Sequence, residues 1–184
     1  AQVDPADRRI HTTLEQTVTA TGRLSSRNPN LQNIPIRTEL GREIRACFVA
    51  GGADRVLLSA DYSQIELRLL AHFSGASGLV EAFRAEQDVH RASAALIFGV
   101  DPGEVTAQDR RIAKTVNYAV IYGQGAGALA AQIGVSRAEA EEYIRNYFDR
   151  LAGVRQYLDQ VVRTAEEQGF VETLTGRRRC LPEL

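Results

Sequence analysis

Residues 110–123 read RRIAKTVNYAVIYG and contain the one lysine among the 22 lysines and arginines of this chain. Lysine carries a compact point charge that suits phosphate clusters, whereas arginine offers a flat fork. Arg110, Lys114, Tyr118 and Tyr122 are each four residues apart, and on a helix this spacing makes one slowly drifting stripe. The stripe would be about 18 Å long, with a cationic first half and an aromatic second half. The spacing therefore predicts a helix that binds a triphosphate at one end and a sugar and base at the other.

The same stretch also has a purely structural interpretation. Basic residues four apart usually form a solvated helix face, and tyrosines at this spacing usually lie at the edge of a core. Short motifs match by chance often enough that residues 110–123 alone leave both interpretations open.

A second segment, residues 56–73, reads VLLSADYSQIELRLLAHF. The apolar run Val56–Ala60 has the length of a buried strand, and helical periodicity follows it. Asp61 stands at the junction, where a carboxylate is costly unless it is paired or binds a metal, although an Asx turn would also explain it. Ser63 and Glu66 have the spacing of a capping box, which predicts a helix start and gives Glu66 a structural role as an alternative to a catalytic one.

Taken together, DYSQIELR (61–68) and RRIAKTVNYAVIYG (110–123) resemble motifs A and B of the family A DNA polymerases, the bacterial DNA polymerase I type. Three other stretches agree with this resemblance, which covers roughly residues 11–184. They are TATGRLSSRNPNLQNIPIRT (19–38), which is similar to the primer–template-binding segment, DVHRASAALIFGV (88–100), which is similar to the fingers helix with a phosphate-facing histidine, and GFVETLTGRRRCLP (169–182).

The resemblance implies a metal site and a filter for the sugar. Asp61, helped by the backbone carbonyl of Tyr62, would bind catalytic Mg²⁺, and the intact enzyme would use two such ions. Glu66 would lie under the sugar, reject a 2′-hydroxyl and hydrogen-bond Tyr122. Tyr122 would occupy the insertion site and hold the templating position.

The resemblance also implies nucleotide and DNA contacts. Arg110 and Lys114 would hold the β- and γ-phosphates with help from His90, Lys114 would take part in catalysis, and Tyr118 would stack beside the sugar and base. The full set of implied nucleotide-binding residues is Tyr62, Gln64, Glu66, His90, Arg110, Lys114, Tyr118 and Tyr122. The implied primer–template contacts are Arg23, Asn30, Gln32, Arg37 and Tyr122.

Tyr118 and Ala119 depart from the commonest family pattern, which has Phe and then Gly. A Tyr at this position goes with weak rejection of dideoxynucleotides, because a phenol hydroxyl can replace the hydrogen bond lost with the 3′-hydroxyl. Our hypothesis is that the parent enzyme accepts dideoxynucleotides readily. Ala119 in place of Gly should stiffen the helix, since Gly is about 1 kcal/mol worse than Ala inside a helix.

The expected fold class is α+β and mostly helical, a partial polymerase palm with a helical fingers lobe. Residues 1–74 would form the partial palm with the primer–template segment and motif A, residues 75–169 the fingers with motif B, and residues 170–184 a hairpin. Residues 39–48 should form a short helix with Ile44, Cys47 and Phe48 facing inward. The expected helix-start signals are Thr106 with Asp109 and Ser136 with Glu139, and Gly169 should end the last helix.

Two-metal phosphoryl transfer needs two carboxylate positions that hold metal ions about 4 Å apart, and the family supplies the second from the His-Asp-Glu turn of motif C. No such turn occurs in these 184 residues, and a thumb, motif C and any exonuclease domain are absent from them. We therefore expect that this chain is part of a longer polymerase and that it does not polymerise on its own. The alternatives are a non-catalytic remnant that binds nucleotide and DNA, and a single-subunit RNA polymerase, against which Glu66 argues.

The bulk composition adds little. The net charge is −1, so a global basic field would not attract DNA, and basic charge is local instead. Cys47 and Cys180 have no metal spacing and are interpreted as free thiols in a reducing bacterial cytoplasm, near the nucleoid. The sequence contains no long apolar run, which predicts no membrane association. The expected partners are primer–template DNA and dNTPs, and the expected state is a monomer.

Overall fold

The computed structural model describes residues 3–36 and 38–183. The chain divides into two compact units: an N-terminal unit, from the first 61 residues with Glu172–Arg179, and a helical unit, Tyr62–Val171 with Cys180–Leu184. The division falls after Asp61, whereas the sequence analysis placed a boundary after residue 74. Helix α2 lies between these two points and packs against α3, α5 and α8 of the helical unit. The assignment of the segments to palm and fingers stays a prediction.

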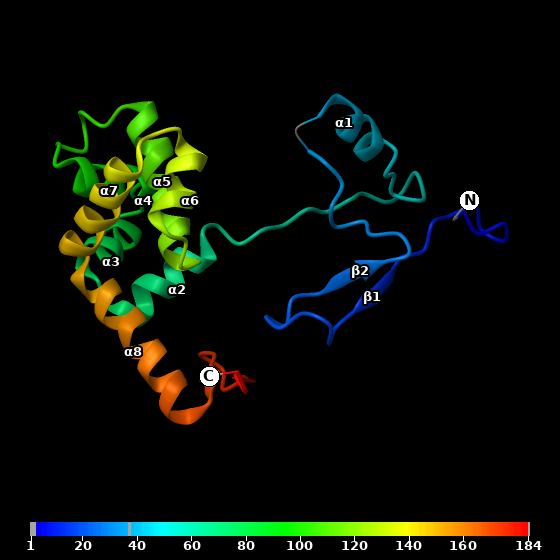
Figure 1. Ribbon diagram of the computed structural model, residues 1–184. Coiled ribbons are helices and arrows are strands. Elements are labelled where there is room, and N and C mark those ends of the chain that lie inside the picture. Colours follow the sequence, from blue (N-terminus) through cyan, green and yellow to red (C-terminus); the bar gives the residue numbers. More distant parts are fainter. Residues whose placement is uncertain (1–2, 37, 184) are drawn as a thin grey trace. The chain divides into compact units, whose positions relative to one another are not determined.

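The N-terminal unit contains one antiparallel hairpin and one short helix (Figure 1). Strand β1 (Thr13–Glu15) pairs with β2 (Ser25–Arg27), with Leu14 opposite Ser26. An ion pair between Arg27 Nε and Glu15 Oε1 at 2.5 Å joins the two strands. Helix α1 (Glu39–Ala46) begins where the Thr38 hydroxyl accepts a hydrogen bond from the Gly41 N–H at 3.1 Å.

The helical unit packs seven helices around one core and leads into a short hairpin (Figure 1). The last helix ends at Gly169, which adopts φ +71°, as its place at the helix end predicts. The helices are α2 (Ile65–Ser74), α3 (Ser77–Arg84), α4 (Val89–Phe98), α5 (Ala107–Ile121), α6 (Ala126–Ile133), α7 (Arg137–Arg150) and α8 (Ala152–Gln168). Strands β3 (Phe170–Glu172) and β4 (Arg178–Cys180) follow, and their residues divide between the two units. This mostly helical composition with a few short strands confirms the expected α+β class.

The helix-start signals predicted at Thr106 and Ser136 are confirmed, and both form capping boxes. Thr106 accepts from the Asp109 N–H at 3.1 Å while the Asp109 carboxylate accepts from the Thr106 N–H at 3.0 Å. Ser136 and Glu139 form the same reciprocal pair at the start of α7. Each box satisfies two N–H groups that the first turn of a helix would otherwise leave unpaired.

The core of the helical unit lies where α4 and α5 cross α3 and α7. The largest apolar side chains that are fully buried in this core are Tyr147, Leu67, Leu79, Ile97, Leu129, Leu151, Val89, Val116 and Val154. Helix α5 contributes one face to this core, which includes Ile112, Ala113, Val116 and Val120. The opposite face of α5 carries the predicted functional stripe, in which Lys114 is exposed and Tyr118 packs partly against the core.

Three sequence-based predictions are wrong. Val56–Ala60 is not a buried strand: Val56 is 88% and Leu58 is 90% exposed, because no segment in residues 3–36 or 38–183 pairs with it to satisfy its backbone. The Ser63–Glu66 capping box does not form, since α2 begins after Gln64 in the left-handed conformation with no side-chain cap. Ile44, Cys47 and Phe48 of the α1 segment are not packed inward, since all three are exposed.

Ile44 and Phe48 are 41% and 44% exposed because they line an open hollow of the N-terminal unit. The hollow measures about 680 Å³, and its other apolar lining residues include Ile10, Leu31 and Ile34. A helix face beside an open hollow loses the close contacts that a packed core would provide.

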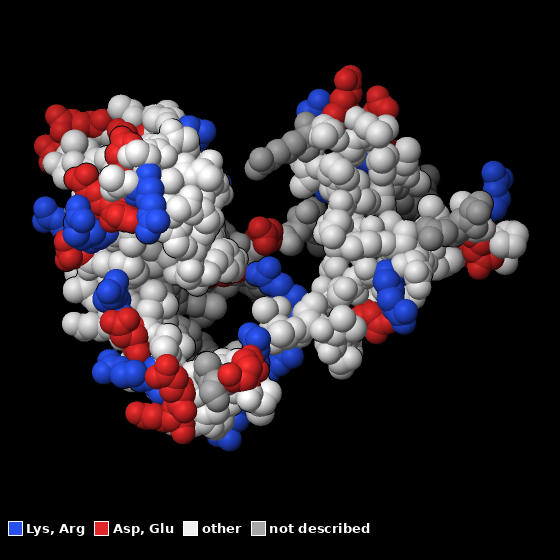
Figure 2. Space-filling view, in the orientation of Figure 1, with Lys and Arg blue, Asp and Glu red and all other residues white. Residues whose placement is uncertain are grey.

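Acidic and basic side chains are interspersed on the face of the helical unit seen in Figure 2. This distribution agrees with the net charge of −1 and with the view that basic charge acts locally. Among the described residues, the helices are all too short or too polar to span a lipid bilayer.

Candidate active site

The predicted stripe on α5 is confirmed as one face of a single helix. Lys114 is exposed, Arg110 and Tyr118 are half-buried, and Tyr122, the residue that ends the helix, is 62% exposed. The stripe is accessible because the buried residues of α5 lie on the other face of the helix. Cationic groups lie toward the N-terminal end of the helix, where the helix dipole adds positive potential.

Arg110 is joined to the beginning of the neighbouring helix through Asp88. Arg110 Nε donates to Asp88 Oδ2 at 2.5 Å, while Asp88 Oδ1 accepts from the His90 and Arg91 N–H groups at 3.0 and 3.2 Å as the N-cap of α4. Burial alone would raise the pKa of Asp88, but hydrogen bonds from Arg110 and from the Arg91 backbone outweigh it and lower the pKa. The ion pair uses Nε, which leaves the two terminal guanidinium nitrogens of Arg110 for other acceptors.

His90 lies on α4 beside the stripe and is only 3% exposed. Its Nδ1 is 3.2 Å from Asn117 Nδ2 on α5, and its ring centroid is 6.0 Å from that of Tyr118. Burial lowers the pKa of His90, and the positive charges of Arg110 and Lys114 lower it further. The structure thus brings His90, Arg110, Lys114 and Tyr118 together, as the resemblance implied.

Glu66 and Tyr122 are also brought together. The Tyr122 hydroxyl donates to Glu66 Oε1 at 2.7 Å, across 56 residues of sequence, and this confirms the predicted hydrogen bond. The chain can turn directly after Tyr122 because Gly123 adopts φ +63°. Glu66 therefore joins the first turn of α2 to the aromatic end of the α5 stripe.

Asp61 and Tyr62 lie at the division between the two compact units. Asp61 is exposed, and its carboxylate has no hydrogen bond or ion pair within residues 3–36 and 38–183. The Tyr62 side chain is 79% exposed. Gln64 is half-buried and precedes α2 with φ +52°. An unpaired, exposed carboxylate is available to a hard cation such as Mg²⁺.

The predicted primer–template residues of the N-terminal unit have different environments. Asn30 Oδ1 accepts from Ser26 Oγ at 3.1 Å and from the Gln32 N–H at 3.0 Å, and Gln32 Nε2 donates to the Leu24 carbonyl at 3.1 Å. These contacts give Asn30 and Gln32 a role in shaping the loop after β2. Arg23 is exposed, and the predicted contact Arg37 lies outside the described residues.

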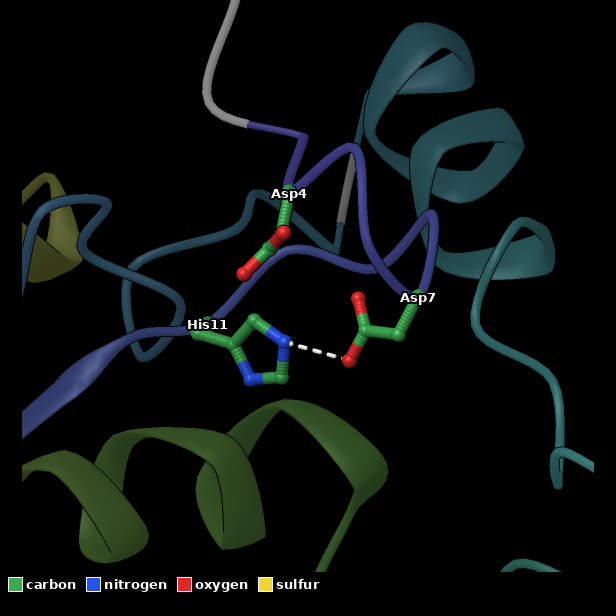
Figure 3. Close-up of side chains that lie close together, drawn as sticks. All are labelled: Asp4, Asp7 and His11. Atoms are coloured by element: carbon green, nitrogen blue, oxygen red, sulfur yellow. Dashed lines mark hydrogen bonds and ion pairs between the residues drawn. The ribbon is translucent and has the colours of Figure 1, made fainter.

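A separate cluster of possible metal ligands occurs near the start of the chain (Figure 3). Asp4, Asp7 and His11 are all exposed, and their ligand atoms lie within 4.8 Å of one another. His11 Nε2 hydrogen-bonds Asp7 Oδ2 at 2.8 Å, and Asp4 and Asp7 each accept from a nearby backbone N–H. These internal contacts already explain the cluster, and it does not include the predicted metal ligand Asp61.

Two residues of the site, Asp88 and Asn117, have no role in the sequence-based prediction. A signal existed for each. Asp88 directly precedes a helical pattern, as an N-cap does, and Asn117 is a polar residue on the otherwise apolar face of α5. Neither pattern reveals the partner on the other helix.

Comparison with known proteins establishes the family of this chain. The sequence model described as DNA polymerase family A matches residues 1–184. The chain belongs to DNA polymerase family A. This confirms the resemblance seen in DYSQIELR and RRIAKTVNYAVIYG.

Among its family A relatives, the chain is 56% identical over 183 residues to DNA polymerase I of Pseudomonas aeruginosa. This match covers 100% of this chain and 20% of that protein. It is 53% identical over 180 residues to DNA polymerase I of Streptococcus pneumoniae, covering 97% of this chain and 20% of that protein. The chain thus spans about a fifth of the length of the curated relatives it matches.

A solved structure agrees with the family A assignment. The chain is similar to the POL domain of Pol1 from M. smegmatis in complex with DNA primer-template and dNTP, with a TM-score of 0.89 and 51% identity. That match covers 100% of this chain and 32% of the solved chain.

Proposed function

We propose that the protein carrying this chain is a template-directed DNA polymerase that transfers nucleotides from dNTPs to a primer 3′-hydroxyl, in DNA replication and repair. The observation that carries this proposal is the joint presentation of Arg110, Lys114 and His90 beside Tyr118 on α4 and α5. Two cations and an imidazole suit a triphosphate, and an aromatic ring next to them suits a sugar and base.

Arg110 and Lys114 would bind the β- and γ-phosphates, and Lys114 would in addition neutralise charge that develops on the leaving pyrophosphate. The primer 3′-oxygen would form a bond to the α-phosphorus as the bond to the bridging oxygen of the β-phosphate breaks. Tyr62 and Gln64 complete the proposed nucleotide contacts. Catalysis of this kind depends mainly on positioning and on charge neutralisation.

Asp61 would hold Mg²⁺ with the Tyr62 backbone carbonyl. A free, exposed carboxylate beside a carbonyl fits the hard oxygen ligands that Mg²⁺ takes together with phosphate oxygens. When bound, two such ions would activate the attacking oxygen and stabilise the leaving one.

Glu66 would serve as the filter for the sugar. Its carboxylate is held in place by the Tyr122 hydroxyl at 2.7 Å, and a fixed carboxylate under the sugar would leave no room for a 2′-hydroxyl. Tyr122 would at the same time occupy the templating position. These roles make deoxyribonucleotides the proposed substrates.

Primer–template DNA is the proposed partner of the N-terminal unit, through Arg23, Asn30, Gln32 and Arg37. The similar M. smegmatis structure contains primer-template DNA and dNTP, which supports both partners. An exposed arginine such as Arg23 can donate to the minor-groove acceptor that every base pair offers, so it can test pairing without reading sequence.

Replacing the proposed metal ligand tests the function. Asp61→Asn in the natural protein that carries this sequence should lower kcat for primer extension by about a thousandfold, because a neutral amide binds Mg²⁺ poorly and several kcal/mol of charge stabilisation are lost. Asp54→Asn changes another exposed carboxylate of the same unit and should leave kcat unchanged. If Asp61→Asn keeps the rate within a few-fold of the parent, the metal-binding role of Asp61 is wrong.

A further inference from the structure

Asn117 is a fully buried amide in the middle of the apolar core of the helical unit. It is 0% exposed, and its hydrogen-bonding neighbours Ser93 and His90 are 1% and 3% exposed. Burying an amide is costly unless its polar atoms are paired. The other buried positions of α5 are apolar: Ile112, Ala113, Val116, Ala119 and Val120. An apolar side chain would pack there without that cost, so the amide calls for an explanation beyond packing.

The hydrogen bonds of Asn117 have a defined direction. Ser93 Oγ donates to Asn117 Oδ1 at 3.1 Å, so the oxygen side of the amide faces Ser93 and the nitrogen side faces His90. Asn117 Nδ2 lies 3.2 Å from His90 Nδ1. An amide nitrogen only donates, so His90 Nδ1 accepts and carries no proton. The neutral imidazole then carries its proton on Nε2.

We propose that Asn117 is a positioning residue that holds His90 as the tautomer with a proton on Nε2, so that His90 presents an N–H donor to a phosphate oxygen of the bound nucleotide. This inference rests on the proposed function, in which His90 contacts the triphosphate. Asn117 itself does not touch the nucleotide, since it is wholly buried. Ser93 holds the amide in the orientation that this role requires.

The groups around His90 agree with a neutral ring. Burial and the charges of Arg110 and Lys114 lower its pKa, and Asp88 at the start of α4 acts in the opposite direction. Tyr118 lies beside the ring, with centroids 6.0 Å apart. In the neutral ring that Asn117 favours, Nδ1 accepts and the proton is on Nε2, and in a cationic ring Nε2 is protonated as well. The N–H donor is therefore insensitive to pH, which suits a permanent phosphate contact.

Asn117→Asp tests this role, because a carboxylate of nearly the same shape can only accept from Nδ1. In the variant, His90 would present Nε2–H only while the ring is cationic, and Nε2 would become an unprotonated acceptor as the pH rises through the His90 pKa. The KM for dNTP of the variant relative to the parent should therefore rise about tenfold between about pH 6 and about pH 9. The measurement is steady-state primer extension in the natural protein that carries this sequence.

Two further variants separate the role of Asn117 from a merely structural one. Asn117→Leu buries no charge and leaves the tautomer unspecified, so KM should rise several-fold at neutral pH even if Asn117→Asp does not fold. In a His90→Leu background, neither Asn117 variant should raise KM further, because contacts that act as one unit are not additive. Asn146→Asp is the matched control: Asn146 Nδ2 donates to the Ile97 carbonyl at 3.0 Å, away from His90, so its loss should affect stability and not KM.

The outcomes distinguish the inference from the function on which it rests. If His90→Leu raises KM but each Asn117 variant multiplies KM by the same factor with and without His90, the positioning role is wrong while the phosphate contact stands. A pH-independent KM ratio for a folded Asn117→Asp protein also overturns the positioning role. If His90→Leu leaves KM unchanged in an active polymerase, the phosphate contact itself is wrong.

Discussion

Two roles were possible for Glu66, a capping box with Ser63 and a tertiary hydrogen bond with Tyr122, and the structure shows only the second. Its spacing from Ser63 is that of a capping box, yet its carboxylate accepts from the Tyr122 hydroxyl at 2.7 Å, and α2 begins without a side-chain cap. A capping box requires the Ser to sit at the N-cap position, whereas Gln64 occupies it here in the left-handed conformation. The Glu66 carboxylate makes a tertiary contact instead of a capping contact.

Tyr118 is the residue with the sharpest functional consequence. Its side chain is half-buried on the stripe, and in the described parts of the chain its hydroxyl has no hydrogen-bond partner. This hydroxyl is therefore available to a nucleotide that lacks a 3′-hydroxyl.

We predict that Tyr118→Phe lowers the incorporation of dideoxynucleotides relative to dNTPs by about tenfold to a hundredfold, the worth of one hydrogen bond to a charged group. A competition assay on one template measures this ratio. Tyr143→Phe removes another half-buried hydroxyl, on α7, and should leave the ratio unchanged. A parent enzyme that already rejects dideoxynucleotides as strongly as the variant would contradict the hypothesis.

At the scale of elements, close helix packing depends on one glycine. A Cβ placed on Gly153, in the first turn of α8, would lie 2.7 Å from the Ser74 carbonyl oxygen and 3.4 Å from Ala76 Cα. Both contacts are to backbone at the end of α2, which cannot rotate away as a side chain can. The glycine thus lets α8 approach the α2–α3 connection.

Gly153→Ala should destabilise the helical unit by about 1–3 kcal/mol, because the added methyl forces backbone apart. Gly127→Ala is the opposite case: it lies inside α6 with nothing within 4 Å of its Cβ position, so it should stabilise by up to about 1 kcal/mol. Denaturant unfolding of both variants gives the two free energies. If both variants change the free energy of unfolding equally and with the same sign, the close backbone packing inferred at Gly153 is wrong.

At the scale of the whole molecule, the charges of the chain are nearly balanced, with a net charge of −1. A global field would therefore not attract DNA, and the proposed DNA contacts must depend on local basic groups. The chain also divides into two compact units, with Asp61 at the end of one and α5 inside the other.

We predict that the purified 184-residue chain does not extend a primer in the presence of Mg²⁺. Two-metal transfer needs carboxylates that hold two metal ions about 4 Å apart, and in the described residues the cluster of three metal-capable side chains, Asp4, Asp7 and His11, does not include Asp61. The natural protein that carries this sequence is the positive control in the same primer-extension assay. Mg²⁺-dependent extension by the chain alone would refute the two-carboxylate requirement.

The sequence by itself determined the family and the capped starts of α5 and α7, whereas the capping box expected at Ser63–Glu66 does not form. The Thr106–Asp109 and Ser136–Glu139 boxes and the stripe from Arg110 to Tyr122 follow from residues three or four positions apart. Such short-range rules act within one turn of helix, so they hold wherever the helix is placed. They failed at Val56–Ala60, because a strand needs a partner that local pattern does not supply.

The tertiary structure decided which side chains meet across elements, except for Glu66 and Tyr122, whose hydrogen bond the family resemblance already implied. The Arg110–Asp88 ion pair spans 22 residues, the Asn117–His90 hydrogen bond 27 and the Tyr122–Glu66 hydrogen bond 56. These contacts depend on how α2, α4 and α5 cross, and that crossing is set by close packing of the whole apolar core. Periodicity shows which face of a helix is buried, but the partner on the facing helix is chosen by the packing.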